Sequence, residues 1–519
     1  MILKSNTIYV GLLYAVSLLD LAVLYFTQGS CADIAFFVVL TVIILALLIR
    51  VSFIKPQLLY SILIFFIFFF PKIYMQNSWG DTLINNLFGN AQEWPYSFFD
   101  NYFIPLFSVV FFFAALLYRM RGTKQSGMEG LWAVRFRWFM MILAFISILS
   151  CGSYFVHEEF FPSSYFPLAV GGLFIMLGGY GVTVIPFDPD ELIKKITIYS
   201  KILTLVLALE LILVSIGAMP SAITHYSVDV KGGFGSMMFG ASVYVGFFAL
   251  LMFVFIFRDV IINKKRSGIV LLVMDVLLIL STFDRNPFFA LILFLCIYLL
   301  FFGKRKIKML FMVCAVGLLV NIGALTSVLD PMNAKGGDVL NASSTVDRLA
   351  LQLRGIDVFA SNPVLGYGSG SFIWLSVSPY IPNSVANYIP DPILFEYYDK
   401  VVTGEHKSNT HNMFILRFPE LGMIAFAYLF FLFVLPVIFL ARFKEVRENP
   451  EYSMWLFAIL AINFFYCFQA LPDYFVFYAL LFRILILKKD QIISVTAMQK
   501  NEAIEHPVCS PVGRAFLKV

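Results

Sequence analysis

The residues best suited to chemistry lie in or directly after one polar segment, residues 329–410, of a chain that is otherwise apolar. Arg348 offers a planar, permanently charged fork of donors, which suits an anionic group. Gly366 and Gly368 stand in a turn where backbone amides have no side chains in front of them. His411 is the histidine best placed to act as a general base. The region therefore combines groups that can bind an anion with one that can accept a proton.

A capped helix followed by a glycine turn is expected to position these groups. Ser344, with Asp347 three residues later, predicts the start of the helix. Pro363 predicts its end near Asn362, because proline disfavours helical geometry in the residue before it. Between these points four apolar residues recur at helical spacing and leave Arg348 on another side: Leu349, Leu353, Ile356 and Ala360.

A second, shorter helix is expected to begin at His411, with Thr410 as its cap. Pro419 is expected to interrupt this helix before the next apolar span begins. Arg417 stands three residues before Glu420, a spacing that favours an ion pair on one face of a helix.

The composition excludes a water-soluble fold. The chain is 60% hydrophobic with a mean hydropathy of +0.86, whereas soluble domains contain roughly 45 to 50% apolar residues. Windows of about 20 apolar residues predict about fourteen transmembrane helices. The expected spans are 8–26, 34–48, 58–70, 103–118, 138–156, 165–185, 196–218, 236–257, 269–282, 287–302, 310–329, 420–440, 453–470 and 474–487. The predicted fold class is an all-α polytopic membrane protein with a large outside loop between the eleventh and twelfth spans.

Basic residues set the expected orientation. Cytoplasmic loops carry an excess of Lys and Arg, and in this chain such residues gather on alternate loops near 50–55, 119–137, 194–195, 258–266, 304–308, 442–447 and 488–489. Both termini would then be cytoplasmic. The expected organisation is a bundle of about eleven helices at 1–328, an outside catalytic loop at 329–410, C-terminal spans at 411–487 and a cytoplasmic tail at 488–519. Basic loops also account for the net charge of +5 without a nucleic-acid partner.

Several acidic residues have structural interpretations. Asp188-Pro189-Asp190 predicts a helix start on a cytoplasmic loop. Asp20, Glu210 and Asp275 lie within expected spans, where a charge costs about 2.5 to 3.5 kcal/mol, so each is expected to face the bundle interior or to be protonated. Structural pairing and a transport path are both open for them. The six cysteines show no metal-binding spacing.

Two groups of motif residues form a pattern across this region. Arg348 is followed by the turn Pro363-x-x-Gly366-x-Gly368, and His411-Asn412 is followed by Glu420-Leu421-Gly422. This pattern resembles the O-antigen ligase and polymerase family of bacterial envelope glycosyltransferases. Members of that family often show Ser-Arg-Gly where this chain has Asp284-Arg285-Asn286.

The resemblance implies an enzyme of the bacterial inner membrane whose active site faces the periplasm or the cell exterior. It would use an undecaprenyl-diphosphate-linked glycan donor and transfer the glycan to a sugar hydroxyl without metal, cofactor or nucleotide sugar. Arg348 and Arg285 would bind the diphosphate as the sugar bond breaks, and His411 would be the base. The residues expected to bind substrate are Arg354, Gly366, Gly368, His406 and Asn412. Besides donor, acceptor and membrane lipid, a chain-length regulator and a flippase are candidate partners.

Three functions stay open at this point. The length of the chain and its extra spans favour a polymerase of lipid-linked repeat units. A ligase that moves the finished glycan to lipid A-core or another acceptor would use the same chemistry. A flippase or transporter of lipid-linked oligosaccharide belongs to a different class and would need intramembrane charges lining a path.

Overall fold

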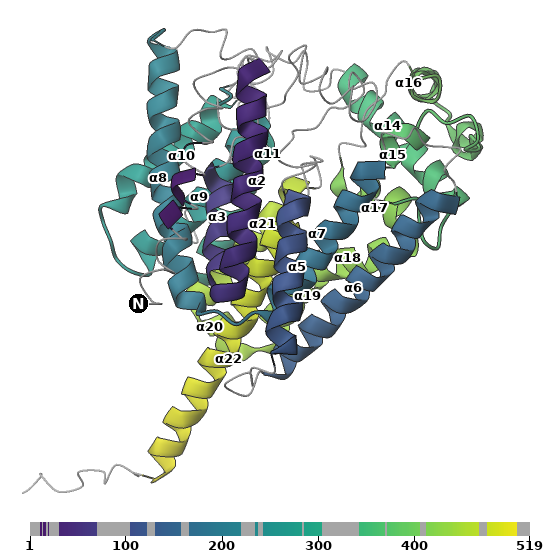
Figure 1. Ribbon diagram of the computed structural model, residues 1–519. Coiled ribbons are helices and arrows are strands. Elements are labelled where there is room, and N and C mark those ends of the chain that lie inside the picture. Colours follow the sequence, from purple (N-terminus) through teal and green to yellow (C-terminus); the bar gives the residue numbers. More distant parts are fainter. Residues whose placement is uncertain are drawn as a thin grey trace, which may run out of the picture.

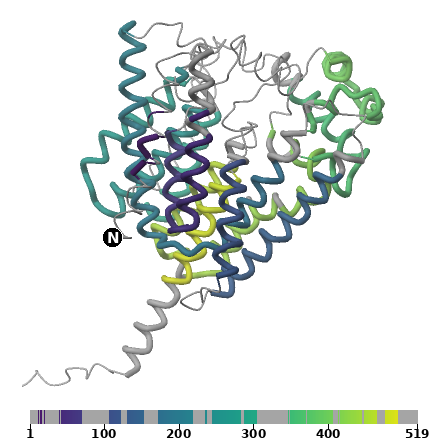
Figure 2. The backbone as a smooth tube through the Cα atoms, in the orientation of Figure 1, coloured from purple at the N-terminus to yellow at the C-terminus, as the bar shows by residue number. Residues whose placement is uncertain are grey.

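The computed structural model is an assembly of helices that cross the molecule from one end to the other (Figures 1 and 2). It describes residues 11–12, 14–16, 19, 31–69, 104–121, 130–156, 166–218, 234–236, 242–282, 285–303, 342–368, 371–404, 412–466 and 475–505. Within these ranges the regular elements are helices, and no strand is present. The expected all-α class is confirmed for the described part of the chain.

The N-terminal helices match the expected spans closely. They are α2 (Cys31–Ile54), α3 (Leu58–Phe69), α5 (Ile104–Met120), α6 (Leu131–Val156), α7 (Phe166–Val184), α8 (Pro189–Ser215), α9 (Ser242–Ile261), α10 (Gly268–Ser281) and α11 (Arg285–Phe302). Most of the span expected at 8–26 and all of the span expected at 310–329 lie outside the described residues.

Three of the described helices contain segments long and apolar enough to cross a membrane, namely Leu131–Gly152, Pro189–Ser215 and Tyr244–Ile261. Shorter apolar helices accompany them at Val42–Ile54, Leu58–Phe69, Leu106–Met120, Gly172–Val184, Gly268–Ser281 and Asn286–Phe302. This pattern is consistent with a polytopic membrane protein. The number of fourteen spans and the division into an N-terminal bundle, loop, C-terminal spans and tail stay predictions.

The span expected at 420–440 is broken into short pieces. These are α17 (Met413–Leu421), a 3₁₀ turn η6 (Gly422–Ile424), α18 (Ala425–Leu429), a wide π turn η7 (Phe430–Val434) and α19 (Leu435–Arg442). Pro419, expected to interrupt the first helix, lies inside α17, and the break falls at Gly422, whose φ is +61°. Pro436 has no N–H to donate back toward residue 432, which is where the wide turn lies.

The remaining C-terminal helices are α20 (Lys444–Glu448), α21 (Pro450–Tyr466) and α22 (Phe475–Glu505). Helix α22 continues well past residue 488, where only a tail was expected. Arg483 lies buried within α22, where its Nη1 donates to the carbonyl of Ile185, 2.6 Å away, and to the hydroxyl of Tyr60, 2.8 Å away. This buried cation ties α22 to α3 and to the chain just after α7.

Loops with basic residues meet at one end of the bundle. Arg258 in the last turn of α9 pairs with Glu451 at the start of α21 at 2.7 Å, and Lys488 on α22 pairs with Asp190 at the start of α8. Asp188 caps α8 by accepting from the N–H of Asp190, as expected from the sequence. The polar elements of residues 342–404 lie at the opposite end (Figure 1). Among the described residues, these paired basic side chains and the polar elements thus lie at opposite ends, while the full alternation of basic and polar loops stays a prediction.

Charged residues inside the expected spans face the interior. Glu210 is buried and accepts from Ser236 at 2.8 Å, and Asp275 is buried and accepts from Thr204 at 2.8 Å. The prediction for these two residues is confirmed by their burial, while Asp20 lies outside the described residues.

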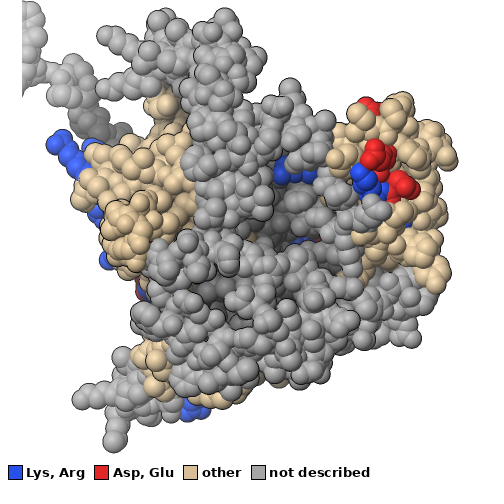
Figure 3. All heavy atoms as spheres, turned by 90° about the horizontal axis from the view of Figure 1, so that it is seen from above, with Lys and Arg blue, Asp and Glu red and all other residues tan. Residues whose placement is uncertain are grey.

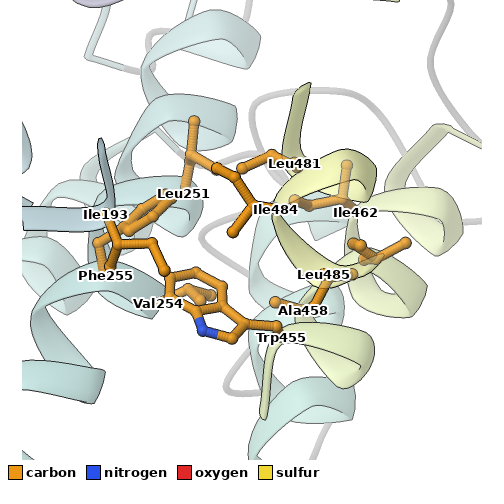
Figure 4. A pocket seen from close by; sticks show the side chains of 11 residues that line it. Ile193, Leu251, Val254, Phe255, Trp455, Ala458, Ile462, Leu481, Ile484 and Leu485 are labelled. Carbon is orange, nitrogen blue, oxygen red and sulfur yellow. The ribbon is translucent and has the colours of Figure 1, made fainter. Parts of the chain in front are cut away.

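An apolar pocket lies between α8, α9, α21 and α22 (Figure 4). Its walls are aliphatic and aromatic side chains, with Trp455 along one side. Ile193 and Trp455 both stand near the first residues of their helices at the basic end. The pocket is therefore remote from the polar segment at the other end, and its lining offers no titratable group.

Candidate functional site

Helix α14 (Ala342–Ser361) is the main element of the polar segment and carries both of its candidate arginines, Arg348 and Arg354. It ends at Ser361, directly before Asn362, as expected from Pro363. It begins at Ala342, two residues before the expected cap, a difference within the ordinary spread of helix ends. The helix packs against α16 (Pro392–Val402) and α17. It therefore links the membrane helices to the described polar elements of residues 342–404, which we call the outside segment after the side expected for them.

Arg354 holds the outside segment together. Its guanidinium is fully buried and donates to the carbonyl oxygens of four residues and to one side-chain amide oxygen at 2.7 to 3.2 Å: Ser376, Ser378, Ile381, Pro382 and Asn383. Asp357, one turn along the helix, balances the charge at 3.7 Å. The donors of Arg354 are thus engaged by protein atoms. This corrects the expectation that Arg354 binds substrate and gives it a role in folding residues 376–383.

Asp357 extends this buried network to α16. One carboxylate oxygen accepts from the N–H of Val385 at 3.0 Å, and the other accepts a short hydrogen bond from the hydroxyl of Tyr398. Burial raises the pKa of Tyr398 well above its ordinary value, and the bond to Asp357 adds to this shift. Asp391 caps α16 by accepting from the N–H groups of Ile393 and Leu394. The segment therefore has a polar core of its own.

The glycine turn after α14 docks directly onto the start of the broken span. The N–H of Tyr367 donates to the carbonyl of Pro419 at 3.0 Å, and the N–H of Gly368 donates to that of Glu420 at 2.9 Å. In return, the N–H of Met423 donates to the carbonyl of Pro363 at 2.7 Å. The two motif groups recognised in the sequence, more than 50 residues apart, thus form one backbone-to-backbone contact.

This contact changes the expected role of the glycines. The N–H of Gly366 donates to the carbonyl of Asn362 at 3.1 Å, so the amides of Gly366 and Gly368 both bond to protein carbonyls. They were expected to present free amides to substrate. The structure instead shows that the missing side chain of Gly366 lets its backbone approach that of Glu420 and Gly422 closely. Gly366 and Gly368 also adopt positive φ angles, +65° and +98°.

The docked turn is also fixed to helix α6. Ser150 of α6 donates from its hydroxyl to the carbonyl of Glu420 at 2.9 Å, alongside the bond from Gly368. The side chain of Glu420 forms the expected ion pair with Arg417 at 2.6 Å, and both residues are buried. Removing one partner would leave an uncompensated buried charge, so the fold requires both residues at the end of α17, next to the turn.

The remaining candidate residues surround this framework. Arg348 lies on α14 with its side chain partly exposed, and Arg285 is the first residue of α11. Asn412 precedes α17 and accepts from the N–H of Ile415 at 3.1 Å, so Asn412 caps the helix in the place expected for Thr410. His406 and His411 lie outside the described residues. Figure 3, which looks onto this end, shows acidic and basic side chains gathered over the outside segment, where Lys400 pairs with Glu396 at 2.6 Å.

The described part of the chain combines helices long and apolar enough to cross a membrane with a polar segment in which two glycine motifs contact each other. This combination is consistent with a polytopic membrane protein. Residues 268–430 match the family model described as O-antigen ligase. The match runs from the first residue of α10 into the π turn η7, so it contains α14, the glycine turn and the Glu420-Leu421-Gly422 motif. This match supports the expected resemblance of residues 268–430 to the O-antigen ligase and polymerase family. No curated protein matches the chain.

The match over residues 268–430 supports a membrane enzyme that acts in the assembly of O-antigen or a related polysaccharide, with a lipid-linked glycan and an acceptor as its substrates. Sequence reasoning found the region and the motif residues. It missed the buried arginines Arg354 and Arg483 as structural ties, and it missed Ser150, which has no motif around it.

Proposed function

We propose that this protein polymerises undecaprenyl-diphosphate-linked oligosaccharide repeat units at the outer leaflet of the cytoplasmic membrane. The observation that carries the proposal is the match at residues 268–430, which includes the interlocked glycine motifs and the partly exposed Arg348 on the helix that leads to them. The position of this segment opposite the basic loops supports an outward-facing site. The length of the chain and its additional helices favour polymerase over ligase.

In the proposed reaction, an acceptor sugar hydroxyl attacks the anomeric carbon of the lipid-linked glycan. A new C–O bond forms as the bond from the anomeric carbon to the diphosphate oxygen breaks, and the diphosphate leaves with the bonding electron pair. Arg348 and Arg285 stabilise the charge that develops on this leaving group. His411 accepts the proton of the attacking hydroxyl.

The framework around these residues supports their placement. Asn412 caps α17, which fixes the chain directly after His411. The docked turn of Gly366 and Gly368 fixes the end of α14, and with it the helix that carries Arg348. We retain Asn412 and His406 as candidate substrate contacts, and we assign Gly366, Gly368 and Arg354 to the support of the site.

The experiment that separates the three functions measures glycan chain length in cells lacking the protein. Loss of a polymerase leaves single repeat units attached to the acceptor. Loss of a ligase leaves long chains that stay on the lipid carrier, and loss of a flippase leaves no outward-facing intermediate. We expect single-repeat product, restored to long chains by the intact gene, and unattached long chains would replace the proposal by the ligase alternative.

A further inference from the structure

The apolar stripe of α14 points away from the protein. Leu349 and Ile356 are 42% and 49% exposed, and Ala360 on the same face is also exposed. The opposite face, with Ala350, Leu351 and Val358, is the one buried in the outside segment. A helix normally turns its apolar stripe toward the core. Here the polar network of Arg354 and Asp357 occupies the buried side, and the hydrocarbon faces outward.

This outward face carries no charge. The positions that recur at helical spacing, Leu349, Leu353, Ile356 and Ala360, are all apolar, and Val364 beyond the helix end is 62% exposed. A contiguous apolar surface of this kind on a polar segment marks a site of interaction with another apolar surface.

The stripe continues into the surface of the membrane helices. Phe359 of α14 packs against Phe418 of α17 with ring centroids 5.5 Å apart, and Phe418 packs against Phe426 of α18 at 5.0 Å. Phe426 is 56% exposed, and it heads a row of exposed apolar residues along the broken span: Met423, Phe430, Val434 and Val437. The span 420–440 is a membrane segment by sequence, so its exposed apolar row faces lipid.

We propose that α14 rests in the outer leaflet, with the stripe of Leu349, Ile356 and Val364 in contact with lipid acyl chains. The occupant is membrane lipid because the stripe is an uncharged continuation of a lipid-facing surface. Its amphipathic pattern is the one by which helices lie in the membrane interface. Arg348 directly precedes the first residue of the stripe, so this arrangement holds its guanidinium at the depth of lipid head groups. That this depth would suit the binding of a lipid-linked diphosphate by Arg348 rests on the proposed function. The contact between α14 and the membrane does not depend on it.

The test uses the full chain, without its native cysteines, in nanodiscs. A fluorescent label is placed on Ile356→Cys, and brominated acyl chains are compared with unbrominated ones as the quencher. We expect at least a twofold loss of fluorescence at this position. The matched control is Tyr388→Cys, which is 82% exposed on η5 (Ser384–Tyr388) in the same segment and should show no quenching.

Equal fluorescence in both lipids for the label at residue 356 would overturn the proposal. So would quenching by a brominated lipid-linked donor in an unbrominated bilayer without quenching by brominated bilayer lipids, since the occupant would then be the donor chain. Efficient disulfide cross-linking of two copies through Ile356→Cys, without quenching, would identify a second copy as the partner. Both labelled variants must elute as single, folded species. If Ile356→Cys fails to fold, a label on Leu349→Cys repeats the measurement. None of these readouts requires glycosyl transfer, so they stand apart from the proposed function.

Discussion

Gly366 and Gly422 face each other so closely that neither position has room for a side chain. A Cβ built at Gly366 would lie 2.5 Å from the carbonyl carbon of Glu420, and one built at Gly422 would lie 2.6 Å from the amide nitrogen of Gly366. The atoms in the way are backbone, which cannot move aside as a flexible side chain can. This contact joins α14 to the membrane span that follows the polar segment.

The first prediction concerns this contact. Gly366→Ala should lower the stability of the outside segment by more than the roughly 1 to 2 kcal/mol that a left-handed alanine costs, because a steric clash adds to the strained φ of +65°. Gly404→Ala is the control. Gly404 also has a positive φ, +85°, but a Cβ built there would lie 3.8 Å from the nearest atom, a side-chain carbon of Val377. Thermal unfolding in detergent compares the two, and equal losses would show that close approach is unimportant.

The second prediction concerns Arg354. Arg354→Lys keeps a charge but cannot reach the five acceptors of residues 376–383, and each hydrogen bond to a charged group contributes about 1.5 to 3 kcal/mol. We expect faster proteolysis within that stretch. Lys400→Ala is the control: it removes a surface ion pair with Glu396 and the contact of the ammonium with the Tyr397 ring, so it should change stability by about 1 kcal/mol or less. A stable Arg354→Lys protein that no longer binds donor would instead restore the substrate-binding role.

The third prediction concerns pH. Because burial and Asp357 raise the pKa of Tyr398 in the folded state, the hydroxyl stays protonated when that of the unfolded chain ionises near pH 10. The contribution of protonated Tyr398 to the free energy of unfolding is therefore fully present below about pH 10. It is lost as the pH rises toward the folded pKa, by up to about 1.4 kcal/mol per pH unit. Amide exchange of α14 and α16 should rise more steeply at alkaline pH in the native chain than in Tyr398→Phe. Identical pH slopes would contradict this linkage.

The fourth prediction concerns orientation. In intact cells, a membrane-impermeant thiol reagent should label Tyr388→Cys and spare Lys265→Cys, both in a cysteine-free background, because the outside segment and the basic α9–α10 loop lie at opposite ends. Both positions are exposed, so accessibility within the protein does not decide the result. Labelling of Lys265→Cys alone would invert the proposed topology.

Local features of the fold were predictable from sequence where short-range chemistry decides them. Pro363 set the end of α14, and Asp188 set the start of α8. The motif residues also indicated the region, residues 268–430, that matches the family model described as O-antigen ligase.

Features that depend on distant partners were not predictable. The spacing of apolar residues located the stripe of α14, but it did not show which side of the helix would be buried. That side is decided by hydrogen bonds of Arg354 and Asp357 to carbonyl and hydroxyl groups 22 to 41 residues downstream. Likewise, the sequence shows only that the turn of Gly366 and Gly368 has backbone amides without side chains in front of them. Only the folded chain shows that Pro419 and Glu420 accept hydrogen bonds from this turn.

The most direct test of the central claim is chain extension by the purified full-length protein in nanodiscs, supplied with an undecaprenyl-diphosphate-linked repeat unit. The native chain should give a ladder of two or more repeats. Arg348→Lys keeps charge but loses the fork, and His411→Gln keeps shape but cannot take up a proton, so each should reduce the ladder at least a hundredfold while the protein folds normally. A native protein that makes no product longer than one repeat, or variants that give the same ladder as the native chain, would contradict the account.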